Sequence, residues 1–120
     1  MAHILVAEDE PSVREFVARG LEVLGHHVTA VGDGGAAVER LGQDRFDLLL
    51  TDIVMPVMDG IALALKASAD HPDLKILMMT GFAQEKQRAH NLDALIHDVL
   101  SKPFSLDQLG QAVHRALQAQ

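Results

Sequence analysis

Short apolar runs alternate with longer segments of helical periodicity along the whole chain. The apolar runs are too short for helices, and their apolar residues are consecutive, which is typical of strands buried on both faces of a parallel sheet. They predict five strands, at residues 4–7, 27–31, 47–51, 75–79 and 99–101. The segments between and after them place apolar residues three and four positions apart and predict amphipathic helices. These helices are expected at residues 11–24, 36–41, 61–69, 83–96 and 106–118.

Punctuating residues support several of these boundaries. Pro11 suits the first turn of a helix, and Gly25 suits the position just after its end. The sequence Gly-Asp-Gly-Gly at residues 32–35 predicts a turn before the second helix. Ser105 and Gln108 have the spacing of a capping box, which predicts the start of the last helix.

Five strand–helix units in 120 residues predict one α/β domain. Right-handed crossovers leave few topologies, and at this size we expect a flavodoxin-like, doubly wound, five-stranded parallel sheet with strand order 2-1-3-4-5 and five helices. In such sheets the functional site lies beyond the carboxyl ends of the strands, where the strand order reverses between strands 1 and 3.

Composition excludes several classes of function. The formal net charge of −7 argues against a nucleic-acid binder. The absence of cysteine excludes disulfides, thiolate metal sites and thiol catalysis. No apolar run is long enough to cross a bilayer and no secretory signal is apparent, so we expect a cytoplasmic protein that does not enter membranes.

Polar residues stand where four of the predicted strands end. Glu8 and Asp9 follow the first strand, Asp52 the third, Thr80 the fourth and Lys102 the fifth. Each has an ordinary explanation taken alone, such as an acid at a helix N-terminus, a turn residue or a solvated lysine. The predicted topology brings all five together, and this joint placement favours a functional site.

Three adjacent carboxylates repel one another unless a cation holds them. Oxygen ligands without His or Cys select Mg²⁺ or Mn²⁺. Asp52 is flanked by apolar residues and is the candidate nucleophile, whose attack on phosphorus would give an acyl phosphate. Lys102 would hold a phosphoryl oxygen, and Thr80 would donate a hydrogen bond to another.

With these residues the chain resembles the CheY-like receiver domain of two-component response regulators over essentially all of its length. The resemblance is carried by ILVAEDE (4–10), LLLTDIVMPVMDG (48–60), MMTG (78–81) and LSKPF (100–104). It implies that Asp52 is the phosphoacceptor and that Thr80 and Lys102 contact the phosphoryl group. It also implies that Glu8, Asp9, Asp52 and the backbone carbonyl of Val54 hold the metal, and that the Lys102–Pro103 peptide bond is cis.

The resemblance further implies a single receiver domain over residues 1–120 with no output domain. Such a protein takes a phosphoryl group from a histidine kinase or a histidine phosphotransfer protein, acts on no external substrate, and signals by binding an effector protein as a monomer or weak dimer. The expected effector surface is formed by the fourth helix, the fifth strand and the fifth helix. The sequences of these motifs are similar to those of stand-alone CpdR-type regulators of alphaproteobacteria, which control proteolysis by the ClpXP machine.

Three alternatives stay open at this point. The chain could serve a hybrid histidine kinase system, or it could be a Mg²⁺-dependent phosphotransferase or phosphatase acting on small molecules. A flavin-binding module of the same topology is disfavoured, because acids stand where a phosphate-cradling loop is needed and no Trp or Tyr can stack on the ring.

The sequence departs from the family pattern at four positions. Val99 replaces the Tyr or Phe that moves inward when receivers are phosphorylated, so either Thr80 with its following loop or Phe82 has to carry the switch. Val54 and Phe82 are apolar where polar residues often orient the hydrolytic water, which predicts a slow loss of the phosphoryl group. Val57 stands where the family usually has Gly, which predicts a less mobile loop.

The first helix, at Ser12 to Phe16, is expected to select the phosphodonor.

Overall fold

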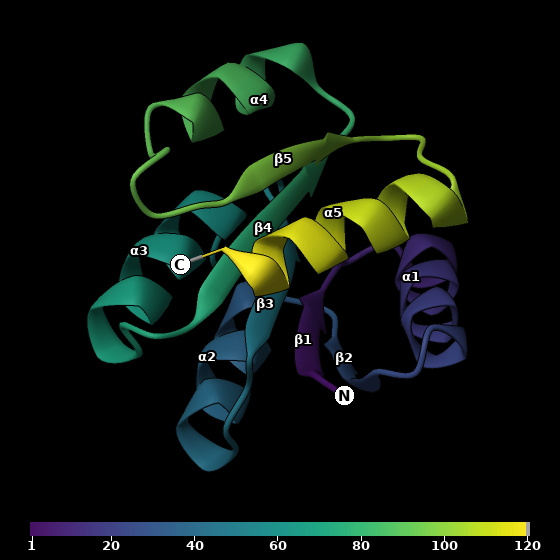
Figure 1. The fold of residues 1–120 in the computed structure, drawn as a ribbon. Helices are drawn as coiled ribbons and strands as arrows, with labels where there is room; N and C mark the ends of the chain where they lie inside the picture. Colours follow the sequence, from purple (N-terminus) through teal and green to yellow (C-terminus); the bar gives the residue numbers. More distant parts are fainter. Residues whose placement is uncertain (120) are drawn as a thin grey trace.

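The computed structural model describes residues 1–119 and shows a central parallel sheet covered by helices on both faces (Figure 1). The strands are β1 (His3–Ala7), β2 (His27–Val31), β3 (Leu48–Asp52), β4 (Lys75–Thr80) and β5 (Asp98–Ser101). The helices are α1 (Pro11–Val23), α2 (Gly34–Gln43), α3 (Gly60–Asp70), α4 (Ala83–His90) and α5 (Leu106–Gln118). The strand order β2-β1-β3-β4-β5, with every pair parallel, confirms the predicted fold.

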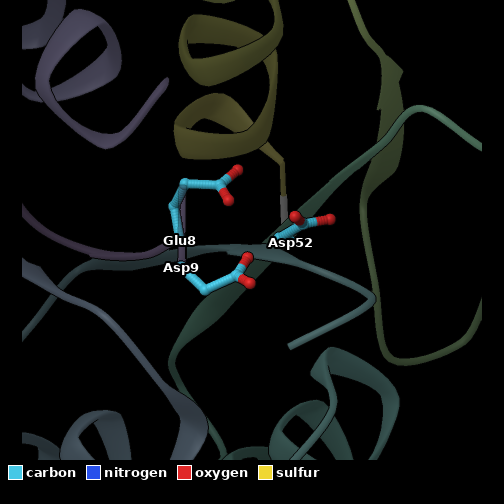
Figure 2. Close-up of side chains that lie close together, drawn as sticks. All are labelled: Glu8, Asp9 and Asp52. Atoms are coloured by element: carbon cyan, nitrogen blue, oxygen red, sulfur yellow. The ribbon is translucent and has the colours of Figure 1, made fainter. Parts of the chain in front are cut away.

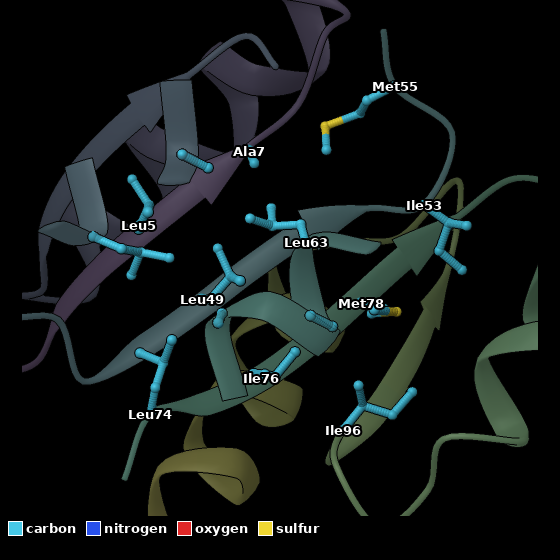
Figure 3. Packing of buried hydrophobic residues seen from close by; sticks show 14 of the residues in the cluster. Leu5, Ala7, Leu49, Ile53, Met55, Leu63, Leu74, Ile76, Met78 and Ile96 are labelled. Carbon is cyan, nitrogen blue, oxygen red and sulfur yellow. The ribbon is translucent and has the colours of Figure 1, made fainter. Parts of the chain in front are cut away.

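Two aliphatic layers enclose the sheet, because alternate strand residues point to opposite faces. Leu5, Leu49 and Ile76 pack with Leu63 of α3 on the face covered by α2, α3 and the segment around α4 (Figure 3). Ile4, Val6, Leu50 and Met79 pack on the opposite face, against Val17 and Leu21 of α1 and Leu109 and Val113 of α5. Because the chain has only four aromatic residues, Leu, Ile, Val, Met and Ala supply nearly all of this buried surface.

The sheet register brings the first and third strand ends together. Ala7 pairs with Thr51 across β1 and β3, so Glu8 and Asp52 both lie one position beyond this pair. Asp52 in turn pairs with Met79, one residue before Thr80. The predicted site is therefore fixed by backbone pairing that involves three neighbouring strands.

The second and fourth helices differ from their predictions. Helix α2 begins at Gly34 instead of residue 36, because the Asp33 side chain accepts a hydrogen bond from the Ala36 amide (2.7 Å) and caps the helix within the expected turn. Helix α4 ends at His90, so the prediction of a helix over residues 83–96 is wrong after that point. Turns follow over residues 91–95, and they carry Ile96 into the core. Helix α2 also ends two residues later than predicted, at Gln43. The remaining boundaries lie within one residue of their predictions, and the capping box of α5 is confirmed.

Two backbone features lie near the carboxyl edge of the sheet. The Lys102–Pro103 peptide bond is cis, as the family resemblance implied. Val57, in the loop between β3 and α3, has φ of 71°, which places a β-branched residue in the left-handed region. Its side chain is 83% exposed, so no buried contact offsets this strain. Among the described residues, no helix is long and apolar enough to span a membrane.

We therefore expect Val57→Gly to raise the free energy of unfolding. A left-handed conformation costs an L-residue about 1–2 kcal/mol, and glycine avoids this cost. Glycine also loses more conformational entropy on folding, so the expected net gain in stability is about 1 kcal/mol. Urea unfolding followed by circular dichroism measures it. Val57→Ala keeps a Cβ at the same φ and serves as the control with a smaller gain. A stability equal to or below that of the wild type would contradict the strain.

Candidate functional site

The three predicted acids converge at the carboxyl edge of the sheet. Glu8 and Asp9 come from the loop after β1 and Asp52 ends β3, and one oxygen of each lies within 4.8 Å of the others (Figure 2). Glu8 is fully buried, Asp52 is 7% exposed and Asp9 faces solvent. Their meeting follows from the register of β1 and β3.

Lys102 joins the two buried acids. Its ammonium lies 2.6 Å from Glu8 Oε1 and 2.9 Å from Asp52 Oδ2, and thus bridges the ends of β1 and β3 from the loop after β5. The other oxygen of Asp52 accepts the Ile53 amide (2.7 Å), and the other oxygen of Glu8 accepts the Glu10 amide (3.0 Å). Each of these carboxylates is thus held on both of its oxygens.

Thr80 is 2% exposed, at the end of β4. Its hydroxyl oxygen accepts the backbone amide of Phe82 at 3.2 Å, which leaves the hydroxyl hydrogen free to be donated elsewhere. Phe82 is 58% exposed at the start of α4, and Val54 is 47% exposed in the loop after Asp52. The slow hydrolysis expected from these two apolar residues stays a prediction.

The buried carboxylates and the lysine shift each other's protonation. Burial raises the pKa of Glu8 above its usual value, although the hydrogen bond from Lys102 opposes this effect. Burial alone would lower the pKa of Lys102, but its hydrogen bonds with Asp52 and Glu8 outweigh burial and raise it. The lysine therefore stays charged and acts as the counter-ion of the acids.

The pKa of Glu8 predicts a pH dependence of stability. Because the pKa of Glu8 is raised in the folded protein, the stabilisation from protonating Glu8 is fully present below the unfolded value of 4.5 and is lost as the pH rises through the folded pKa. Glu8→Gln cannot take up this proton, because glutamine does not titrate. We expect the stability of the variant relative to the wild type to be greater at about pH 7 than at about pH 5. Urea unfolding in the presence of EDTA measures the difference, and a difference that grows on acidification would contradict the raised pKa.

The donor set fits a hard divalent cation. Three carboxylates offer oxygen ligands within a few ångströms, and the cluster contains neither His nor Cys. Two of these acids are buried, where a cation offsets their repulsion most effectively because solvent screening is weak. Lys102 supplies only part of this compensation, since one ammonium faces two buried carboxylates.

Arg14 of α1 also contacts the loop that carries the acids. We expected it among the residues of the first helix that select a partner, but it is only partly exposed and Nη1 donates a hydrogen bond to the backbone carbonyl of Glu8 at 2.9 Å. Nothing in the periodicity of the helix indicates this direction. The only signal in the sequence is Gly32, because a glycine there leaves space for the guanidinium.

Comparison with known proteins agrees with this geometry. The model of the response regulator receiver domain family matches residues 4–114. The chain belongs to this family. The receiver is 46% identical to the response regulator receiver protein CpdR of Brucella abortus over 117 residues, which cover 98% of each chain. It is 38% identical to the response regulator MprA of Mycobacterium ulcerans, but it spans only 46% of that protein.

A solved structure matches the receiver over nearly its whole length. The response regulator TrrA of Thermotoga maritima, described in complex with Mg²⁺ and BeF, superposes with a TM-score of 0.87 at 27% identity. The match covers 97% of the receiver and 99% of TrrA. The receiver thus shares its fold with a protein that was crystallised with a magnesium ion and a phosphoryl mimic.

Proposed function

We propose that the receiver accepts a phosphoryl group on Asp52 from the phosphohistidine of a histidine kinase or a histidine phosphotransfer protein, with Mg²⁺ as cofactor. The observation that carries the proposal is the position of Asp52, a buried carboxylate within 4.8 Å of two further acids and 2.9 Å from an ammonium. Glu8, Asp9, Asp52 and the carbonyl of Val54 would hold the metal. When bound, this ion neutralises negative charge on the phosphoryl oxygens.

The protein's own groups divide the work of transfer. A carboxylate oxygen of Asp52 forms the new bond to phosphorus while the bond from phosphorus to the imidazole nitrogen breaks, and the electron pair of that bond stays on nitrogen. Lys102 stays beside the oxygens and donates to the transferred group. Thr80 donates its free hydroxyl hydrogen to another phosphoryl oxygen. The receiver catalyses only its own modification and turns over no external substrate.

A cavity next to the site suits the phosphodonor. It has a volume of about 410 Å³ and is lined by Ser12, Val13 and Phe16 of α1 and by Lys102, Pro103 and Phe104 of the loop before α5. The rings of Phe16 and Phe104 lie 6.3 Å apart, and Phe16 is 46% exposed. An apolar surface beside Lys102 can hold a donor protein while its histidine faces Asp52.

Thr80 and the start of α4 are the best-placed carriers of the signal. Val99 is 6% exposed and cannot rotate as an aromatic side chain does. A phosphoryl group that draws the Thr80 hydroxyl toward it would disturb the bond between this hydroxyl and the Phe82 amide, and Phe82 is the N-cap of α4. Helix α4 buries only Ala89 among its own residues, so little packing resists its movement. The α4–β5–α5 surface would then bind the effector.

The similarity to CpdR extends the proposal to a single-domain regulator whose output is the control of proteolysis. The match over 98% of both chains supports this organisation, in contrast to the longer MprA.

Beryllofluoride tests the proposal without a donor protein. In ¹H–¹⁵N spectra we expect the amides of Thr80, Phe82 and α4 to shift only when Mg²⁺ and beryllofluoride are both present. Asp52→Asn should abolish these shifts, and Asp44→Asn, at an exposed position that ends α2, is the matched control. Equal shifts in the Asp52 variant would contradict the proposal.

A further inference from the structure

The peptide that joins Glu8 to Asp9 is held at its carbonyl by Arg14, and the peptide before it is tied to the end of β2. The amide of Glu8 donates to the Val31 carbonyl at 3.1 Å, which ties the loop after β1 to the end of β2. The carbonyl of Glu8 accepts the hydrogen bond from Arg14 Nη1 at 2.9 Å. Because this carbonyl belongs to the peptide plane between the two acids, the guanidinium fixes the orientation from which both carboxylates leave the backbone.

Gly32, in the loop after β2, makes room for the guanidinium. A Cβ atom at this position would lie 2.9 Å from Arg14 Nη1, closer than van der Waals contact allows. The only atoms within 4 Å of such a Cβ, apart from its chain neighbours, belong to the end of the Arg14 side chain. The guanidinium is therefore enclosed between the first turn of α1 and two loops of the sheet edge.

We propose that Arg14 is a positioning residue for divalent-metal binding, which it supports by orienting the Glu8–Asp9 peptide. This inference rests on the proposed function, since it assumes that these acids hold Mg²⁺. Arg14 itself touches neither the metal nor the phosphoryl group. Its hydrogen bond lowers the free-energy cost of ordering the two acids when the ion binds, because their shared peptide is already oriented.

The positive charge of Arg14 and its hydrogen bond act on metal affinity in opposite directions. A cation beside the acids repels Mg²⁺, so its removal by itself tightens metal binding. Loss of the hydrogen bond frees the peptide and weakens metal binding. A variant that weakens Mg²⁺ binding therefore indicates positioning, and a variant that tightens it indicates a simple counter-charge.

Two variants on different elements disturb the same hydrogen bond, the first by deletion and the second by displacement. Arg14→Ala deletes the donor, and Gly32→Ala keeps the arginine and its charge but displaces the guanidinium. Arg19→Ala is the matched control, because it removes an arginine of the same helix that pairs with Glu15 in solvent. The receiver has no Trp or Tyr, so the Mg²⁺ dissociation constant is measured from amide shifts in NMR titrations.

We expect Arg14→Ala to raise the Mg²⁺ dissociation constant about five- to tenfold, the equivalent of one ordinary hydrogen bond, and Gly32→Ala to raise it by a smaller factor. Arg19→Ala should leave both the Mg²⁺ dissociation constant and the rate of phosphorylation by acetyl phosphate unchanged. Unchanged or tighter Mg²⁺ binding by Arg14→Ala, or tighter binding by Gly32→Ala, overturns the role of Arg14. A wild-type protein that binds no Mg²⁺ overturns the proposed function itself, so the two failures are distinguishable.

Discussion

Lys102→Ala is expected to destabilise the metal-free receiver by about 3 kcal/mol, because removal of one partner leaves buried carboxylates without their counter-ion. Glu8 is fully buried, and both it and Asp52 are bonded to this one ammonium, at 2.6 and 2.9 Å. In the variant, two like charges remain side by side with little solvent to screen them. Mg²⁺ can take over the role of the lysine at these carboxylates, so the loss of stability should be largely reversed when the ion is added.

Urea unfolding in EDTA and in excess Mg²⁺ measures both effects. Lys66→Ala provides the control, since Lys66 pairs with Asp70 on the exposed side of α3, where an ion pair contributes about 0–1 kcal/mol. In EDTA, the Lys66 variant should have nearly the same free energy of unfolding as the wild type. A Lys102 variant as stable as the control in EDTA, or one that Mg²⁺ does not stabilise, would show that the ammonium is not the counter-ion of these acids.

Gly60→Ala is expected to have a similarly large effect for a steric reason. A Cβ at this position would lie 2.1 Å from the carbonyl oxygen of Asp52 and 2.9 Å from Cα of Ile53, so the backbone has to move. The Gly60 amide also donates to the Ile53 carbonyl at 2.7 Å, which closes the loop onto the end of β3. We expect a loss of about 3 kcal/mol or more in the free energy of unfolding, and slower phosphorylation because Asp52 shifts.

Gly42→Ala is the matched control for this variant. Gly42 lies in α2 and a Cβ there would meet nothing within 4 Å, so alanine should stabilise the helix by about 0.5–1 kcal/mol. The two Gly→Ala changes thus have opposite expected signs in the same urea experiment. Equal stabilities of the Gly60 variant and the wild type would mean that the loop does not pack on Asp52 as described.

Local patterns predicted most of the fold because each carried its own signal. Helix α5 was predicted at both ends, since its apolar face and its capping box indicate the same segment. The start of α2 was missed, because glycines 34 and 35 indicate a turn while Asp33 can cap a helix that includes them. The end of α4 was missed because Leu92, Leu95 and Ile96 have helical spacing, although they lie in or after a series of turns from which Ile96 enters the core and Leu95 packs against it.

The site was predictable to the extent that strand order fixes it. Once β1 lies beside β3, Glu8 and Asp52 have to meet, and the order of the sheet also brings Thr80 and Lys102 to this edge. The sequence did not indicate the directions in which individual side chains point. The turn of Arg14 toward the Glu8 carbonyl and the bond from the Phe82 amide to Thr80 depend on rotamers and loop geometry that no periodicity encodes.

If Asp52 carries the phosphoryl group, intact-mass spectrometry will detect that group on the wild type and will not detect it once the carboxylate is removed. Wild-type receiver and Asp52→Asn are each incubated with acetyl phosphate and Mg²⁺ and then weighed. We expect the mass of the wild type to increase by one phosphoryl group, and we expect no increase for the variant or for either protein in EDTA. A wild type that gains no mass, or a variant that gains the same mass, would contradict this role of Asp52.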